Sequence, residues 1–235
     1  MPPLPPALFV TGTDTGVGKT RIAARMIETL RASGIRAVGY KPVLSGPDRS
    51  DAEILWRASG GESDENAQTV DEVNPVWLNI PAAPLSARLA GESEAGRIDR
   101  CLLIDRFEAL AMRFDFVVIE GTGGWEVPID ETTTFADLAK SFGAPVVVVA
   151  ANRLGVLNHT LLTVEAIRRR DLECVGVILN EIAAPDPDDL ARQTNLETLR
   201  LCLDRPVEPG DWNATGPFPS EILSRFGIET PSVNG

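Results

Sequence analysis

The chain has 235 residues, which is enough for one large α/β domain with a substantial core or for two small domains. Hydrophobic residues make up 43% of the sequence and charged residues 24%, as in an ordinary soluble globular protein. The formal net charge of −12 argues against nucleic acid or an anionic membrane surface as the main partner, because binding either one favours a basic face.

Three further features of the sequence indicate where in the cell the protein is expected. No apolar run approaches the ~20 residues that span a bilayer. The N-terminal stretch Met-Pro-Pro-Leu-Pro-Pro lacks the basic region of a signal peptide, so none is expected. Cys101, Cys174 and Cys202 are odd in number and share no Cys-x-x-Cys spacing. We therefore expect a cytoplasmic protein with reduced, mostly buried thiols.

The first expected element is an apolar strand that runs directly into a glycine-rich loop. Residues 8–20 read Leu-Phe-Val-Thr-Gly-Thr-Asp-Thr-Gly-Val-Gly-Lys-Thr. Small residues let backbone N–H groups converge on an anion, Lys19 can reach the β- and γ-phosphates, and the Thr20 hydroxyl can hold Mg²⁺. Gly12 lies one residue further from Gly18 than the usual Gly-x-x-x-x-Gly-Lys-Ser/Thr spacing requires. A merely flexible turn rarely has a strand before it and a helix after it, so the loop predicts binding of nucleotide phosphates.

The rest of the chain alternates between helical and strand patterns. Continuous apolar runs at 116–119, 145–150 and 175–179 are typical of strands buried on both faces of a parallel sheet. Segment 74–84 holds three prolines and is expected to be an irregular connection. The pattern predicts a single α/β domain over residues 1–235, with a mostly parallel sheet and helices on both faces, P-loop NTPase-like. The remaining expected elements are a strand at 36–40, helices at 21–32, 51–58, 85–90, 97–113, 135–142, 157–169 and 188–201, and a polar stretch at 60–69.

Two polar residues follow the expected strand 36–40. Ligands of such sheets bind beyond the carboxyl ends of the strands, so polar groups placed there carry the most weight. Lys41 begins the stretch Lys-Pro-Val-Leu-Ser-Gly, and it is either a plain surface charge or a ligand-binding cation opposite the P-loop. Asp51 fits two roles equally well, as the N-cap of the following helix or as a ligand of Mg²⁺.

Two further polar residues follow buried strands. Glu120 comes directly after 116–119, where an acid is well placed to hold Mg²⁺, and the glycines after it indicate a close backbone approach. The alternative is a solvated turn acid. Asn180 follows the last apolar run and suits either the edge of a nucleobase or the cap of the next turn. His159, the only histidine, is expected to be structural, and the sequence offers neither a catalytic triad nor a zinc cluster.

Taken together, four motifs resemble those of dethiobiotin synthetases. They are Gly-Thr-Asp-Thr-Gly-Val-Gly-Lys-Thr at 12–20, Lys-Pro-Val-Leu-Ser-Gly at 41–46, Glu-Gly-Thr-Gly-Gly-Trp at 120–125 and Leu-Gly-Val-Leu-Asn-His-Thr-Leu-Leu-Thr at 154–163. Their order and spacing match, from the first strand to at least Asn180. The first and third motifs are shared with wider groups, whereas the second and fourth are far more specific. The extended glycine spacing is itself the form of the P-loop found in this family.

The resemblance implies an ATP- and Mg²⁺-dependent ligase of biotin synthesis. In that reaction 7,8-diaminopelargonic acid takes up CO₂ on one amine as a carbamate, and ATP phosphorylates the carbamate. The second amine then closes the ureido ring, giving dethiobiotin, ADP and phosphate. Charge develops on the transferring phosphoryl group and on the carbamate, so positioned cations would supply most of the catalysis.

The resemblance also assigns the residues of the site. Lys19 and Lys41 match the catalytic cations that clamp the phosphates and the carbamate. The metal would be surrounded by Thr20, Asp51 and Glu120. The diamine and carbamate would contact Thr15, Lys41 and Ser45. The positions that match contacts of ATP are Gly16, Val17, Gly18, Lys19, Thr20, Arg21, Asp51, Glu120, Gly121, Thr122, Gly123, Asn180, Glu181, Pro209, Gly210 and Asp211.

In this family the substrate carboxylate is held by the other subunit, at a helix N-terminus that favours anions. Gly155, Val156, Leu157 and Asn158 match that segment, so the resemblance implies a homodimer with a shared substrate site. Asn180 matches the position that reads adenine. Residues 209–211 lie where a second base-contacting loop falls, but their sequence departs from the family's apolar Leu-Gly-x-x-Pro pattern.

Two other function classes share parts of this pattern. A partitioning or regulatory ATPase usually carries a second lysine early in the P-loop, where this chain has Thr13-Asp14-Thr15, and a charge of −12 suits DNA poorly. An amide-forming synthetase acting on a corrin precursor would need a glutaminase domain, for which 235 residues leave no room. The sequence therefore favours dethiobiotin synthesis.

Overall fold

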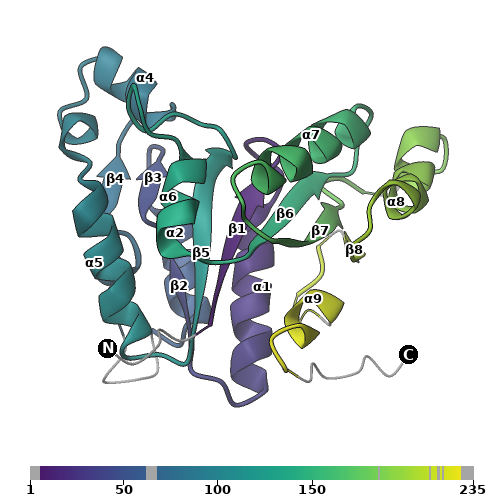
Figure 1. Ribbon diagram of the computed structural model, residues 1–235, viewed down its shortest axis with the longest axis horizontal. Coiled ribbons are helices and arrows are strands. Elements are labelled where there is room, and N and C mark those ends of the chain that lie inside the picture. The colour runs from purple at the N-terminus through teal and green to yellow at the C-terminus, as the bar shows by residue number, and fades with distance from the viewer. Residues whose placement is uncertain are drawn as a thin grey trace.

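The computed structural model describes residues 6–61, 68–184, 186–211, 213–215, 218 and 220–228. Within these residues the centre is a six-stranded sheet with the order β2-β5-β1-β6-β7-β8 (Figure 1). Every neighbouring pair is parallel. The strands are β1 (Ala7–Gly12), β2 (Ala37–Tyr40), β5 (Phe116–Gly124), β6 (Val146–Ala151), β7 (Cys174–Asn180) and β8 (Val207–Gly210).

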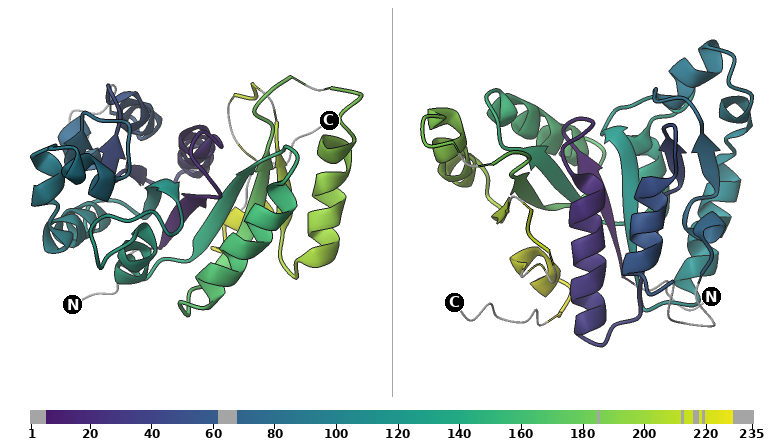
Figure 2. Two further views of the ribbon diagram at one scale, coloured as in Figure 1. Left: turned by 90° about the horizontal axis from the view of Figure 1, so that it is seen from above. Right: turned by 180° about the vertical axis from the view of Figure 1, so that it is seen from behind.

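Helices cover both faces of this sheet, as expected for parallel strands joined by crossover connections. Seen from behind, α1 (Lys19–Ala32) and α2 (Ser50–Ala58) lie across one face, together with the short α9 (Glu221–Ser224) (Figure 2). The other face is covered by α5 (Arg100–Ala111), α6 (Phe135–Phe142), α7 (Val156–Arg168) and α8 (Leu190–Cys202). The expected fold class is confirmed.

Each face of the sheet has its own hydrophobic core, and β1 contributes to both. Leu8 and Val10 pack against α1 on one side, whereas Phe9 packs into the core under α6. Strand side chains alternate between the two faces, so a strand buried on both faces must be apolar at every position. This explains why β1 reads as a continuous apolar run that leads into the P-loop.

The order of the sheet places the P-loop at its centre. β2 and β5 lie on one side of β1, and β6, β7 and β8 lie on the other. In open parallel sheets, ligands bind in the crevice beyond the carboxyl ends of the strands where the strand order reverses. The loop after β1 opens into this crevice.

Capping residues define both ends of α6. α6 begins at a capping box in which the Thr134 hydroxyl accepts from the backbone N–H of Asp137, and the Asp137 carboxylate accepts from the backbone N–H of Thr134. It ends at Gly143, which has a φ of 64°. The predicted range 135–142 is therefore confirmed at both ends.

Three expected features differ from the structure. Segment 74–84 contains a strand, β4 (Val76–Leu78), which pairs in parallel with β3 (Val43–Ser45) after the short helix α3 (Val70–Val73). β5 continues through the glycine-rich stretch to Gly124, so Glu120 lies within the strand and not in a turn after it. Residues 209–210 belong to β8, an edge strand on which a proline is tolerated. The two remaining short helices are α4 (Pro84–Leu89) and a 3₁₀ turn (Glu94–Arg97).

The expectation of mostly buried thiols was wrong. Cys174 is buried in β7, but Cys101 at the start of α5 and Cys202 at the end of α8 are exposed. Each exposed thiol lies on the solvent side of its helix. In the described part of the chain, no helix has the length and apolar character needed to cross a bilayer. Residues 1–5, with most of the proline-rich start, and residues 62–67 of the polar stretch lie outside the described residues.

Candidate functional site

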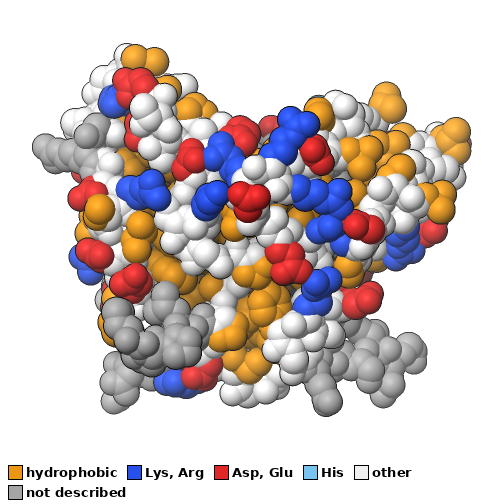
Figure 3. All heavy atoms as spheres, in the orientation of Figure 1, with side chains coloured by type: hydrophobic (Ala, Val, Ile, Leu, Met, Phe, Trp, Pro, Cys, Tyr) orange, Lys and Arg blue, Asp and Glu red, His pale blue; other side chains and the backbone are white. Residues whose placement is uncertain are grey.

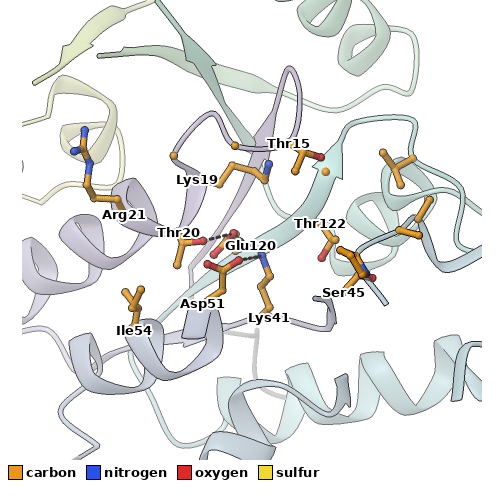
Figure 4. A pocket seen from close by; sticks show the side chains of 17 residues that line it. Thr15, Lys19, Thr20, Arg21, Lys41, Ser45, Asp51, Ile54, Glu120 and Thr122 are labelled. Atoms are coloured by element: carbon orange, nitrogen blue, oxygen red, sulfur yellow. Dashed lines mark hydrogen bonds and ion pairs between the residues drawn. The ribbon is translucent and has the colours of Figure 1, made fainter. Parts of the chain in front are cut away.

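A cavity of about 600 Å³ opens at the carboxyl ends of β1, β2 and β5. Charged side chains of both signs gather in the hollow at the top of the molecule, and the P-loop faces α2 across the cavity (Figures 3 and 4). Most of the residues that sequence analysis assigned to phosphate, metal and carbamate binding line this one cavity. They are Thr15, Gly16, Gly18, Lys19, Thr20, Arg21, Lys41, Ser45, Asp51, Glu120, Thr122 and Gly123.

The P-loop presents backbone donors and a buried lysine to the cavity. Gly18 has a φ of 91°, and α1 starts after it without a side-chain cap, so the first-turn N–H groups stay available to an anion. The Lys19 ammonium donates to the carbonyl of Asp14 at 2.9 Å. Burial and, next, repulsion from Lys41 lower the pKa of Lys19 to about 8. Phosphate oxygens bound beside Lys19 would stabilise its charged form and so oppose both effects.

Lys41 lies on the floor of the cavity and bridges two acids. Its ammonium is 2.5 Å from Glu120 Oε1 and 3.6 Å from Asp51 Oδ2. The side chain of Lys41 is 3% exposed and that of Glu120 is 1% exposed, so Lys41 is not a plain surface charge. Asp51 lies in the first turn of α2, one residue after the helix begins, and Arg49 occupies the N-cap position. The N-cap role considered for Asp51 is therefore wrong, and its carboxylate faces the cavity (Figure 4).

The acids of the cavity suit a hard cation. Glu120 Oε2 is buried and has no hydrogen-bond partner among the residues that the structure describes, although an unpaired buried carboxylate oxygen is costly. Glu120 Oε1 accepts from the Thr20 hydroxyl at 2.9 Å. Burial raises the pKa of Glu120, and the nearby Lys41 charge opposes that shift. Among the described residues no group of three His, Cys, Asp or Glu side chains could hold a metal, so a cation here would need Thr20 and phosphate oxygens as well.

Asn74 holds the backbone of Lys41 in place, a role that sequence analysis did not find. Its amide nitrogen donates to the carbonyls of Lys41 and Val76, at 2.8 Å each. The N–H of Lys41 donates to the carbonyl of Val73 at 2.7 Å. Arg49 in turn donates to the Asn74 side chain at 3.2 Å. In the sequence, the only indication of this role was that Asn74 is a polar residue before Pro75, at the start of an otherwise apolar stretch.

Two hydroxyl groups lie on the wall of the cavity that β3 and β5 form. Ser45 Oγ is buried and has no partner within the described structure, so it is available to a ligand. The Thr122 hydroxyl donates to the carbonyl of Val43 and ties β5 to β3. Thr15 is exposed at the mouth of the cavity. The lining also includes an apolar group formed by Ile54, Pro81, Ala82, Ala83 and Val127.

The residues matched to the nucleobase lie together at the ends of β7 and β8, beside the cavity. Arg21 reaches them from α1 and donates to Asn180 Oδ1 at 2.9 Å and to the carbonyl of Asp211 at 2.9 Å. The carboxylate of Glu181 instead accepts from Arg192 and Asn152, so only its backbone faces this region. Pro209 and Gly210 pair with β7.

The segment Gly155–Asn158 lies apart from the cavity. Gly155 has a φ of 91° and precedes α7, which begins without a side-chain cap. Val156 is buried in the core, whereas Asn158 and His159 are exposed. None of these residues lines the cavity of their own chain.

A family model described as an AAA domain matches residues 6–207. The ATP-dependent dethiobiotin synthetase BioD of Akkermansia muciniphila is 42% identical over 200 residues, covering 85% of this chain and 88% of that protein. The protein of the same name from Anaeromyxobacter dehalogenans is 42% identical over 212 residues, covering 86% and 90%. The chain belongs to the dethiobiotin synthetase family.

A solved structure supports the fold of this dethiobiotin synthetase family member independently. The septum site-determining protein MinD of Pyrococcus horikoshii, complexed with Mg-ADP, aligns with a TM-score of 0.51 over 88% of this chain and 82% of that one. At 16% identity the likeness concerns the fold alone, and it confirms the P-loop NTPase-like architecture.

Proposed function

We propose that this cavity carries out the ATP-dependent ligation that closes the ureido ring of dethiobiotin. The observation that carries the proposal is the placement of two buried lysines and two acids around one P-loop. The substrates are 7,8-diaminopelargonic acid, CO₂ and ATP. Phosphoryl transfer to a carbamate needs positioned positive charge more than it needs a proton-transfer group, which agrees with a cavity lined by lysines and without histidine.

The nucleotide is held by the P-loop. The free N–H groups at the start of α1 bind the β- and γ-phosphates, and Lys19 leaves the Asp14 carbonyl to pair with them. Thr20, Asp51 and Glu120 would hold Mg²⁺, and Glu120 Oε2 would supply an oxygen to it. When bound there, the ion would neutralise negative charge on the transferring phosphoryl group.

The carbamate lies between the P-loop and β3. Lys41 pairs with its developing negative charge, and the free hydroxyl of Ser45 together with Thr15 hydrogen-bonds its oxygens. The apolar wall made by Ile54, Pro81, Ala82, Ala83 and Val127 accommodates the aliphatic chain of the diamine. This arrangement aims the γ-phosphate at the carbamate.

The enzyme acts as a cytoplasmic homodimer, with the chain forming a single domain. The N-terminus of α7 lies away from its own cavity, so residues 155–158 serve the cavity of the partner and bind the substrate carboxylate there. Exposed leucines accompany this helix: Leu154, Leu161 and Leu162. Hydrophobic side chains gather at the upper right of the molecule, over α7 and α8 (Figure 3).

One assay tests the proposed function directly. Purified protein is incubated with the diamine, bicarbonate and MgATP, and dethiobiotin is measured by mass spectrometry while ADP is followed by a coupled assay. We expect stoichiometric dethiobiotin and ADP, and no ADP above background when the diamine is left out. Turnover of ATP that does not depend on the diamine, with no dethiobiotin formed, would rule the function out.

A further inference from the structure

The guanidinium of Arg21 lies against the ends of β7 and β8, beside the positions that match base-contacting residues of the dethiobiotin synthetase family. One of its nitrogens, Nη2, donates to Asn180 Oδ1 at 2.9 Å, to the carbonyl of Asp211 at 2.9 Å and to the carbonyl of Glu181 at 3.2 Å. In Figure 4 the side chain points away from Lys19 and Thr20, towards the yellow-green C-terminal part of the chain. Arg21 therefore joins α1 to both strand ends at which a base would be read.

The carboxamide of Asn180 is enclosed on every side that the structure describes. Its nitrogen donates to the carbonyl of Val17 at 2.8 Å, its oxygen accepts from Arg21, and the residue is 1% exposed. A Cβ placed on Gly18 would lie 2.2 Å from the amide nitrogen, and one on Gly210 would lie 2.8 Å from the amide oxygen. Asn180 thus braces the P-loop against β7 and β8, and no base edge can reach it while Arg21 stays in place.

We propose that Arg21 determines nucleobase selectivity in this chain: its guanidinium covers the carboxamide of Asn180, so the site accepts nucleotides with little discrimination among bases. The inference rests on the proposed function, because it takes the P-loop beside Asn180 as the site of the nucleotide phosphates. Affinity then comes mainly from the phosphates and from the face of the guanidinium.

The chemistry of the two side chains explains why Asn180 would discriminate among bases whereas Arg21 would not. A carboxamide carries a donor and an acceptor, and it matches the N7 and N6 positions of adenine with two hydrogen bonds. A guanidinium carries donors only, so it cannot accept from the amino group of adenine. Its planar face can stack on any base, which contributes affinity without selectivity.

The test measures binding and needs no turnover. Calorimetry gives the dissociation constants of the Mg²⁺ complexes of ADP, GDP, CDP and UDP, and of the adenine analogues 7-deaza-ADP and IDP. The proteins are the wild type, Arg21→Met, which keeps the apolar stem on α1, and Arg169→Ala. Arg169 is an exposed arginine at the C-cap of α7, and its replacement controls for the loss of one positive charge. Circular dichroism melting shows whether each variant is folded.

For the wild type we expect dissociation constants for the four natural diphosphates within about fivefold of each other. In Arg21→Met, Asn180 becomes accessible, and ADP should bind roughly tenfold more tightly than IDP or 7-deaza-ADP, as a two-bond contact to adenine predicts. Arg169→Ala should behave as the wild type. A wild-type preference for ADP above tenfold, or unchanged ratios in a folded Arg21→Met, would overturn the inference alone. If none of the diphosphates binds the wild type, the proposed function fails together with it.

Discussion

Lys41 and Glu120 form a buried ion pair, with 2.5 Å between the ammonium and Oε1, at the point where β2 ends beside the middle of β5. The chain has only three lysines, Lys19, Lys41 and Lys140, against nineteen arginines, and two of the three line the cavity. A lysine ammonium is a compact charge that can move between a carboxylate and a phosphate, whereas a guanidinium is a broad planar fork. The pair therefore places a mobile cation where the carbamate is proposed to form.

Replacing Lys41 by alanine should abolish most product formation while nucleotide binding is kept. We expect the rate of dethiobiotin formation to fall at least about 100-fold, the loss typical when one group that stabilises the transition state is removed. The dissociation constant of MgADP should stay within about threefold, because the P-loop donors are untouched. Rapid-quench assays and calorimetry measure the two quantities. Lys140→Ala, which removes an exposed lysine on α6, is the matched control, and full activity of Lys41→Ala would contradict the carbamate role.

The same variant should be less stable because Glu120 loses its partner. Removing one member of a buried ion pair costs about 3 kcal/mol or more, since the remaining charge is left in a poorly solvated place. The double variant Lys41→Ala/Glu120→Gln should recover most of that loss. Urea unfolding of the two variants and the wild type measures it. Equal stability of the single and double variants would mean that Glu120 is not charged in the free protein.

Glu120→Gln should raise the magnesium requirement of the enzyme. The substitution keeps the shape of the side chain but removes the negative charge of a carboxylate whose Oε2 has no hydrogen-bond partner within the described structure. We expect the Mg²⁺ concentration for half-maximal activity to rise at least about tenfold, because carboxylates are the preferred ligands of this ion. Titration of activity with Mg²⁺ at saturating ATP provides the measurement. The control is Glu53→Gln on the exposed side of α2, which should leave the titration unchanged.

Binding of nucleotide should weaken as the pH rises through about 8. In the free protein the pKa of Lys19 is lowered from 10.5 to about 8, so above pH 8 the lysine must take up a proton before it can pair with phosphate. Below pH 8 Lys19 is already charged, so its titration should not change the affinity for nucleotide there. Calorimetry at pH 8.5 in buffers of different ionisation enthalpy should show net proton uptake. Lys19→Arg stays charged and should remove both the uptake and the change near pH 8.

The part of the site that could be predicted from the sequence is the part made of contiguous motifs. The P-loop needs only β1, Lys19 and the start of α1, and all of these lie within a short stretch of chain. β4 escaped prediction because a three-residue strand between prolines carries too little periodicity. The contact between Arg21 and Asn180 joins residues 159 apart in sequence, so only the folded sheet brings them together.

Asn74 contacts Lys41 from 33 residues further along the chain, so this contact too depends on the folded structure. Asn74→Ala leaves the carbonyls of Lys41 and Val76 without their donors, which should cost about 1–3 kcal/mol of stability. Because the Lys41 backbone is then less well held, kcat should fall while KM for ATP changes little. Asn79→Ala, an exposed asparagine just after β4, is the matched control. A loss of stability with unchanged kcat would make Asn74 a structural residue only.

The surface of α7 is expected to form the interface of the proposed dimer. Leu162 is 62% exposed there and also lines a groove with Trp125 and Val127 beside β5. In the proposed dimer this surface is covered, so Leu162→Glu should give a monomer in sedimentation velocity experiments at assay concentration. Its kcat/KM for the diamine should fall at least about tenfold, because the carboxylate loses the helix N-terminus of the partner. Binding of MgADP should be unchanged, since the P-loop belongs to one chain. Leu201→Glu on α8, where the leucine is 89% exposed, should remain dimeric and active. A wild-type protein that is monomeric and fully active would refute the shared site.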